Sequence, residues 1–448
     1  MIEIFSILFQ FFLFFFLLSF NIFAVNIKNY KTYGFNFFSK NISFNIIIFL
    51  NFILIASFLN IGLNKIIYIY LIYVSAIALI SIIKFKSYFY FNENYFFNTL
   101  LLFISSIIIF FEIANNLVLG WDTQRVWVYK TLSFYNGFSI DNLSNLPNPF
   151  YPYLGSLSWA FFWKISISDH EYFGRLFYVF CFLVSLLLII NNLKIKNFYK
   201  IIFFVFLIII SYDYTYFIDW GIFSGYQEIL IFCLVANASY FFYELHKNNN
   251  DKANFYIFSI LLICNLLVWI KLEGYVISLS LIFGLLFFCK IDIRKKFLII
   301  FSYLLILLTR VFIFDFYNLN PSEFQHLGYK EFSLVGIFDK ISLDRIFILV
   351  KFLLIDIFAN YLVILSLIIL ILYLIKNKIS KLEFKMIMFF LFLMSFNITI
   401  FSGIFIVTDL DLTWMLKYGL DRIIYQISPI SFYLLMAYVN HLRLSRLS

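Results

Sequence analysis

The chain has 448 residues, of which 64% are hydrophobic and only 13% are charged. This composition excludes a water-soluble multidomain protein and predicts an integral membrane protein with an all-α fold. With 5 Pro and 14 Gly, the chain is also neither collagen-like nor rich in linkers. The net charge of +9 would suggest nucleic acid binding in a soluble protein, but the distribution of the basic residues explains it differently.

Thirteen apolar runs are each long enough to cross a bilayer, because about 20 mostly apolar residues span the hydrocarbon core. We expect one transmembrane helix in each run, which predicts a helical bundle of about 13 spans. The runs lie near residues 3–25, 43–62, 66–84, 98–119, 173–191, 201–218, 226–245, 254–271, 274–290, 297–315, 346–374, 386–407 and 423–441. They divide the chain into N-terminal helices, a first long outer loop, central helices, a second outer loop and C-terminal helices, at 1–119, 120–172, 173–315, 316–345 and 346–448.

Three of these runs have informative ends. The first begins Met-Ile-Glu-Ile, without a basic segment before it or a small-residue cleavage site after it, so we expect a retained span. Lys271, Glu273 and Gly274 interrupt one long apolar stretch and predict a tight turn between two helices. The eleventh run contains Lys351 and Asp356, so we expect its membrane part to begin after an interfacial turn.

The orientation follows from the basic residues, because Lys and Arg in short loops favour the cytoplasmic side of a membrane. With the N-terminus outside and the C-terminus inside, most Lys and Arg residues fall in cytoplasmic loops, and most acidic residues lie at the outer face. The positive charge is therefore a topology signal. We expect a protein of the cytoplasmic (inner) membrane whose outer face is acidic.

Both long outer loops hold many of the acidic residues, and loops of such length are usually functional or disordered. The first is rich in Trp and Tyr, which is typical of helices that lie in the membrane interface. We therefore expect interfacial helices in this loop and an active surface outside, at the membrane boundary. The aromatic residues are Trp121, Trp127, Tyr129, Tyr135, Tyr151, Tyr153, Trp159 and Trp163.

Cysteine and histidine residues do not indicate a metal or redox site. The cysteines lie singly in apolar runs, so we expect small core side chains, and the histidines are scattered. No Walker motif, dinucleotide-binding GxGxxG or nucleophile elbow is present, which argues against direct use of ATP or a nucleotide sugar. The cysteines are Cys181, Cys233, Cys264 and Cys289, and the histidines are His170, His246, His326 and His441.

Four polar motifs lie at the outer ends of the expected helices. The first is GWDTQRVWVYK at 120–130, followed by NPFYPYL at 148–154. The second is GYQEILIF at 225–232 and the third is KLEG at 271–274. The fourth combines DLTWML at 411–416 with LDRIIYQISP at 420–429.

Together these motifs resemble the polytopic lipid-dependent glycosyltransferases of the GT-C superfamily, in the branch related to protein mannosyltransferases and the aminoarabinose transferases of lipid A. There the elements read roughly WDAxxxWxxKA with a YPxxxP element, GYADLPLA, KxEG, and DLxWHL with LDRLLxQxxP. The resemblance implies a GT-C-like fold and an inverting transfer of a sugar from a polyprenyl-phosphate donor to a lipid, glycan or protein acceptor. It implies membrane lipids and no nucleic acid as partners. The sugar, the acceptor and the oligomeric state stay open.

The chain departs from the family pattern at several points. Glu228 stands where the family usually has Asp, Ile229 where it has Pro, and Met415 where His is common. Three or four helices also precede the first acidic loop, where many relatives have one. These departures leave the role of Glu228 and of the N-terminal helices open.

Carboxylates suit the chemistry that such an enzyme performs, because the acceptor must lose a proton while positive charge develops at the anomeric carbon. Asp122 follows the fourth expected helix and is the predicted base, although an acid can also simply mark a helix end that faces water. Glu228 is its predicted partner, with Asp219 as the substitute, although the helix dipole alone explains an acid at that position. A divalent metal ion on Asp122 and Glu228 stays open.

Basic residues near the motifs are candidates for binding the donor phosphate. Arg422 and Lys271 are the first choices, and Lys417 and Arg125 follow, because Arg offers a bidentate fork and Lys a point charge. Each of them can also be a simple anchor that snorkels from a helix end. Two other functions stay open, a flippase or transporter of a lipid-linked saccharide and a non-catalytic scaffold.

Overall fold

The computed structural model describes residues 2–19, 36–84, 93–212, 221–247, 252–320, 340–376 and 379–444. These residues form helices and turns without a strand, which confirms the predicted all-α class. Among them, nine helices are long and apolar enough to cross a membrane, and one bent pair would make a tenth span. Shorter apolar helices lie at Glu3–Ser19, Asn197–Tyr212 and Gly274–Phe288. Each of the thirteen predicted runs overlaps one of these helices or the bent pair, and residues 20–25 and 213–218 of two runs lie outside the described residues.

The chain forms two compact units. The first comprises Met1–Ile208, Trp220–Cys233 and Val311–Leu319, and the second comprises Ile209–Asp219, Leu234–Arg310 and Asn320–Ser448.

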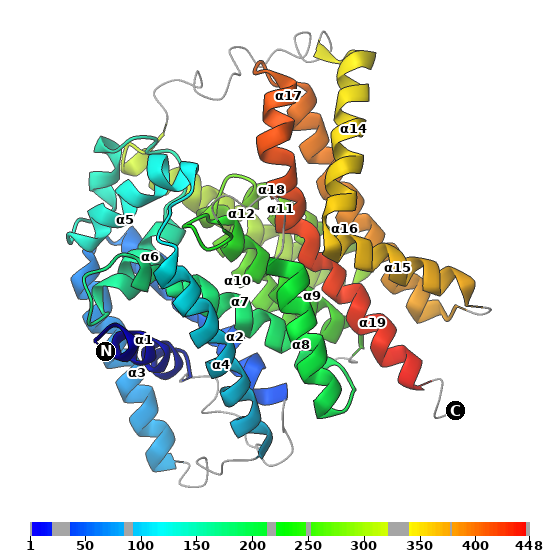
Figure 1. Ribbon diagram of the computed structural model, residues 1–448. Helices are drawn as coiled ribbons and strands as arrows, with labels where there is room; N and C mark the ends of the chain where they lie inside the picture. The colour runs from blue at the N-terminus through cyan, green and yellow to red at the C-terminus, as the bar shows by residue number, and fades with distance from the viewer. Residues whose placement is uncertain are drawn as a thin grey trace. The chain divides into compact units, whose positions relative to one another are not determined.

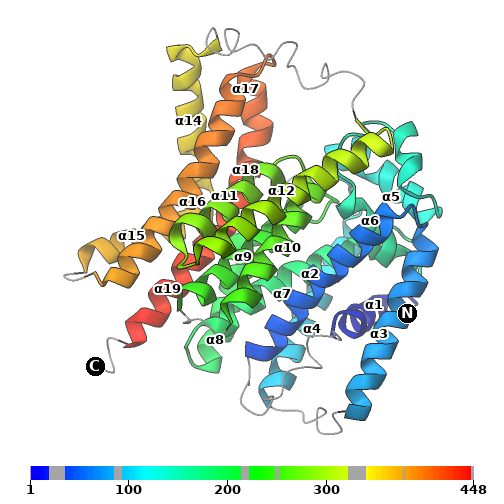
Figure 2. The same cartoon turned by 180° about the vertical axis from the view of Figure 1, so that it is seen from behind.

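Helix α7 (Tyr172–Asn192) is the centre of the first unit. All of its residues are buried, as expected of a helix that is apolar on every side. It packs against α1, α2, α4 and α6 (Figures 1 and 2). The other long helices of this unit are α1 (Ile2–Ser19), α2 (Asn36–Phe58), α3 (Leu63–Lys84), α4 (Glu93–Asn115) and most of α8 (Asn197–Tyr212).

The segment 120–172 is folded into four short helices. They are η3 (Thr123–Trp127), α5 (Val128–Tyr135), η4 (Ile140–Asn145) and α6 (Leu154–Lys164). Of the aromatic residues expected at the interface, Trp121 and Tyr129 are exposed, whereas Tyr153, Trp159 and Trp163 are buried. The aromatic side chains of α6 pack within the first unit: Phe161 contacts Phe49 of α2, Trp163 stacks on Tyr135 of α5, and Phe162 stacks on Phe177 of α7.

The second unit is a bundle in which α11 packs against α10 and α16, while α19 packs against α15 and α16. Its elements are most of α9 (Glu228–Lys247) and most of α12 (Ile293–Phe316), together with α10 (Ala253–Ile270), α11 (Gly274–Phe288), α14 (Leu343–Ala359), α15 (Tyr361–Ile375), α16 (Lys381–Ile406), α17 (Leu412–Met415), η7 (Leu416–Leu420), α18 (Asp421–Ile427), η8 (Ser428–Ile430) and α19 (Ser431–Leu444).

The turn predicted between α10 and α11 is present. Gly274 is the first residue of α11, and a Cβ at this position would lie 1.9 Å from the carbonyl oxygen of Leu267. Only glycine permits such a close approach of two main-chain segments.

The eleventh run differs from a simple span. It is bent by 85° between α14 and α15, and the side-chain oxygen of Asn360 accepts a hydrogen bond from the Val363 amide at the break. An N-cap of this kind starts a new helix, so Asn360 explains where the run breaks. Asp356, one turn earlier, is 1% exposed.

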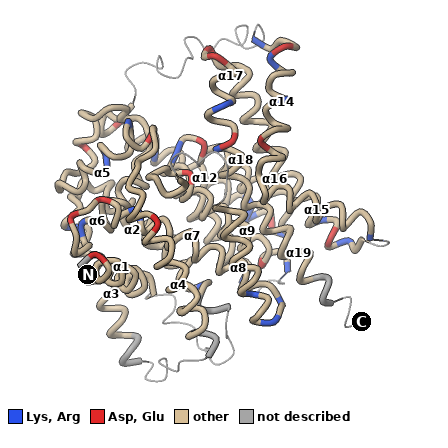
Figure 3. Tube along the Cα trace, viewed as in Figure 1, with Lys and Arg blue, Asp and Glu red and all other residues tan. Residues whose placement is uncertain are grey.

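Charged residues in both units concentrate near helix ends and in loops, while the middle parts of most helices carry none (Figure 3). The four cysteines are buried and unpaired by disulfides, as expected for small core side chains.

Candidate functional site

The predicted catalytic residue Asp122 directly precedes the π-helical turn η3 at the start of the folded segment 120–172. Its side chain is half-buried. Arg125 is exposed, and its guanidinium carbon lies 5.8 Å from the centroid of the Trp121 ring. In the described residues there are two π-helical turns: η3 lies inside the first predicted motif, and η7 connects the two parts of the fourth. Such turns are rare and frequently mark functional sites.

Main-chain contacts join the first motif to the second. The amide of Gly120 donates a hydrogen bond to the carbonyl oxygen of Ser224, with an N–O distance of 3.0 Å. Gly225 has a φ of +90°, and a Cβ there would lie 2.4 Å from the side chain of Thr123. Glycine relieves both the strain and the collision. Thr123, the neighbour of Asp122, therefore packs against Gly225, which lies three positions before Glu228.

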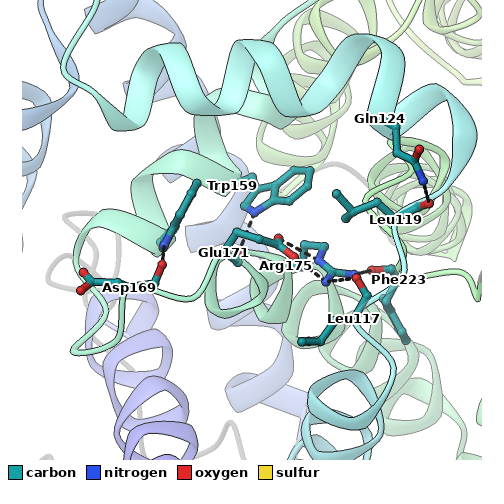
Figure 4. A network of polar contacts seen from close by, with 9 residues as sticks. Leu117, Leu119, Gln124, Trp159, Asp169, Glu171, Arg175 and Phe223 are labelled. Carbon is teal, nitrogen blue, oxygen red and sulfur yellow. Dashed lines mark hydrogen bonds and ion pairs between the residues drawn. The ribbon is translucent and has the colours of Figure 1, made fainter.

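Arg175, in the first turn of α7, ties both segments to the core of the first unit (Figure 4). Its Nη1 donates to the carbonyl oxygen of Phe223 at 3.1 Å, and its Nη2 to that of Leu117 at 3.5 Å. The side chain is 1% exposed. A cation this deeply buried requires partners, and here two of them are carbonyls of the segments that lead to the two motifs.

Glu171 supplies the countercharge. Its two carboxylate oxygens accept hydrogen bonds from Nη2 and Nε of Arg175, at 2.7 and 3.1 Å (Figure 4). The main-chain oxygen of Glu171 accepts from the Trp159 indole at 2.9 Å, and the Trp159 ring lies 6.0 Å from the guanidinium carbon. Burial raises the pKa of the Glu171 carboxyl, although Arg175 acts in the opposite direction. Burial of the two charges costs free energy, and the short hydrogen bonds between Glu171 and Arg175 act against that cost.

The second predicted carboxylate, Glu228, is the first residue of α9 and is fully buried. The adjacent Gln227 donates through Nε2 to the hydroxyl of Tyr178 and to the carbonyl of Gly225, both at 3.2 Å. The start of α9 is therefore fixed against α7 by a buried polar side chain. Asp219, the predicted substitute, lies outside the described residues.

Lys271, a predicted phosphate ligand, lies in the turn between α10 and α11 in the second unit. Its Nζ forms an ion pair with Glu273 at 2.8 Å, and the residue is 5% exposed. Arg310 of α12 lies against both sides of this turn, with its guanidinium carbon 5.5 Å from the Trp269 centroid and 4.7 Å from the Tyr275 centroid. The turn thus gathers two buried cations and two aromatic rings.

The other predicted cations of the second unit surround η7. Arg422 is half-buried in the first turn of α18, directly after the buried Asp421. Lys417 is exposed and lies over the Tyr418 ring at 5.2 Å. Asp122, Arg125 and Glu228 thus belong to the first unit, whereas Lys271, Lys417 and Arg422 belong to the second.

Sequence reasoning did not single out Arg175, Glu171 or Arg310. A signal was present, because Arg175 and Arg310 stand inside predicted apolar runs, where ionisable residues are rare and usually functional. The spacing of Glu171 and Arg175 also matches an i,i+4 ion pair.

The described residues contain no group of three or more His, Cys, Asp and Glu side chains that could hold a metal ion. A comparison with family models, with curated proteins and with solved structures finds no match to this chain.

Proposed function

We propose that this chain is an inverting membrane glycosyltransferase of the GT-C type, which transfers a sugar from a polyprenyl-phosphate donor to a lipid, glycan or protein acceptor. The four motifs in the order typical of that superfamily support this proposal. One structural observation carries it further: the hydrogen bond from Gly120 to Ser224 joins the two motifs that supply Asp122 and Glu228. The bond brings together segments that lie more than a hundred positions apart in the sequence.

In the proposed reaction Asp122 accepts the proton of the attacking hydroxyl or amine of the acceptor. The acceptor attacks the anomeric carbon, the bond from that carbon to the phosphate oxygen breaks, and the polyprenyl phosphate leaves with the electron pair. Attack opposite to the leaving group inverts the anomeric configuration. Glu228 orients the acceptor, and Arg125, Lys271, Lys417 and Arg422 are the proposed contacts for the phosphate charge.

We further propose thirteen spans in the cytoplasmic membrane, with the N-terminus outside and the C-terminus inside. The excess of Lys and Arg in the expected cytoplasmic loops supports this topology. It places the folded loop at 120–172 on the outer side.

The experiment is an in vitro transfer assay. Purified full-length protein is incubated with a labelled polyprenyl-phosphate sugar and a membrane extract that contains acceptors. Transfer of label to an acceptor, lost in Asp122→Asn, supports the enzyme. No transfer by the wild-type protein with a panel of donor sugars contradicts it.

A flippase of lipid-linked saccharides is the second candidate, and Asp356 favours it. Ionisable residues at helix breaks inside a membrane are typical of transport sites, and Asp356 is buried one turn before the break between α14 and α15. In reconstituted vesicles, donor movement across the bilayer without transfer, abolished by Asp356→Asn, would favour this function over the enzyme.

A further inference from the structure

The contacts of Arg175 reach beyond its own helix to both loops of the proposed site. The guanidinium binds main-chain carbonyls at Leu117 and Phe223, which lie five residues before Asp122 and five residues before Glu228 (Figure 4). These carbonyls belong to segments without regular secondary structure, so the segments have no helical ladder to hold them. A planar fork with five N–H donors can hold two loops and one carboxylate at once.

We infer that Arg175 is the positioning residue of the proposed glycosyltransferase site and that Glu171 orients it. The expected effect of Arg175 on catalysis rests on the proposed function. Arg175 fixes the segments 117–122 and 221–228 relative to each other, and so sets the distance between the two carboxylates. It does not touch the reacting atoms in this role.

The arrangement of the partners supports this role over a simple ion pair. Glu171 binds Nε and Nη2, which turns Nη1 toward Phe223 and leaves Nη2 shared with Leu117. The Trp159 ring lies against the guanidinium, and a Cβ at Gly225 would lie 3.0 Å from the same ring. The clamp and the loop that carries Glu228 therefore share one aromatic wall.

Gln10 of α1 provides a matched control within the same unit. It is fully buried, and its Nε2 also donates to two main-chain carbonyls, those of Phe162 at 3.1 Å and Phe173 at 3.2 Å. Neither carbonyl belongs to the segments that precede Asp122 and Glu228. Replacement of either side chain by Met keeps most of the volume and removes the donors.

The experiment compares Arg175→Met, Arg175→Lys and Gln10→Met with the wild-type protein. Amide hydrogen exchange is measured by mass spectrometry on peptides that cover 117–127 and 221–228, together with the melting temperature and the kcat and KM of transfer. We expect Arg175→Met to increase exchange in both peptides and to lower kcat about 10²-fold at little change in KM, as misplacement by about 1 Å does. Arg175→Lys should keep part of the wild-type protection from exchange and part of the wild-type kcat, because lysine keeps the charge but lacks the guanidinium fork. Gln10→Met should lower the melting temperature without changing exchange in the two peptides or kcat.

Two results overturn the inference. One is unchanged exchange at 117–127 and 221–228 in Arg175→Met. The other is a loss of kcat in Gln10→Met as large as that in Arg175→Met at a similar loss of melting temperature, which would reduce Arg175 to general stability. If the wild-type protein transfers no sugar, the proposed function fails, and the exchange data alone still decide whether Arg175 holds the two segments.

Discussion

The amide of Gly120 and the carbonyl of Ser224 form a 3.0 Å hydrogen bond across a separation of more than one hundred residues. Gly120 precedes Asp122 by two positions, and Ser224 precedes Glu228 by four. This bond is one of the contacts that hold together two segments which the sequence could only place on the same side of a membrane. Mutations of the residues around it can test the proposed site.

Asp122 is the first target. Asp122→Asn keeps the size and polarity of the side chain but removes its capacity to accept a proton. We expect transfer to fall about 10² to 10⁴-fold, the range for a lost general base, with an unchanged melting temperature. Asp169→Asn, at an exposed carboxylate of the same loop, is the control and should retain activity. Full activity of Asp122→Asn would remove the central assignment.

Gly225 and Gly221 test the packing of the second motif. Both have positive φ, +90° and +72°. A Cβ at Gly225 would meet the Thr123 side chain, whereas among the described residues nothing lies within 4 Å of a Cβ at Gly221. Gly221→Ala should therefore cost about 1 kcal/mol from the main-chain conformation alone. Gly225→Ala should cost roughly 1–3 kcal/mol more, because its methyl group collides with Thr123. Equal losses of melting temperature in the two variants would contradict the close packing of residues 123 and 225.

Lys271 tests the phosphate contact in the second unit. Lys271→Met should raise the KM for the donor roughly 10 to 100-fold, as expected for the loss of a charged hydrogen bond of about 1.5–3 kcal/mol. Lys376→Met is the control, because it removes a similar ion pair, at 2.7 Å from Glu383, outside the motifs. A similar KM in both variants would leave Lys271 as a structural residue.

Glu171 predicts a dependence of stability on pH. Its pKa is raised by burial above the usual value of 4.5, so its contribution to stability is full below that pH and is lost as the pH rises through the raised pKa. Glu171→Gln has no such titration. The melting temperature of the wild-type protein relative to Glu171→Gln should therefore fall as the pH rises from below 4.5 toward neutrality. Parallel curves for the two proteins would show that the folded state leaves this carboxyl unperturbed.

The apolar pattern predicted the helical class and the position of every apolar helix described above. This succeeds because a span of apolar residues must satisfy its main-chain hydrogen bonds within itself inside a membrane. The aromatic pattern did not predict which side chains are buried within the protein. Helix α6 buries Trp159 and Trp163, because Trp packs well in a core as well as at a membrane interface.

The motifs predicted the candidate carboxylates and the cations Lys271 and Arg422, but they could not show which of these residues lie in the same unit. Asp122 and Glu228 both lie in the first unit, and Arg310 lies beside the turn that holds Lys271 in the second. The apolar pattern is a local property, so by itself it determined where the long apolar helices lie. The tertiary structure alone decided that Arg175 binds the carbonyls at Leu117 and Phe223, because a buried guanidinium selects partners by distance in space, which is independent of distance along the chain.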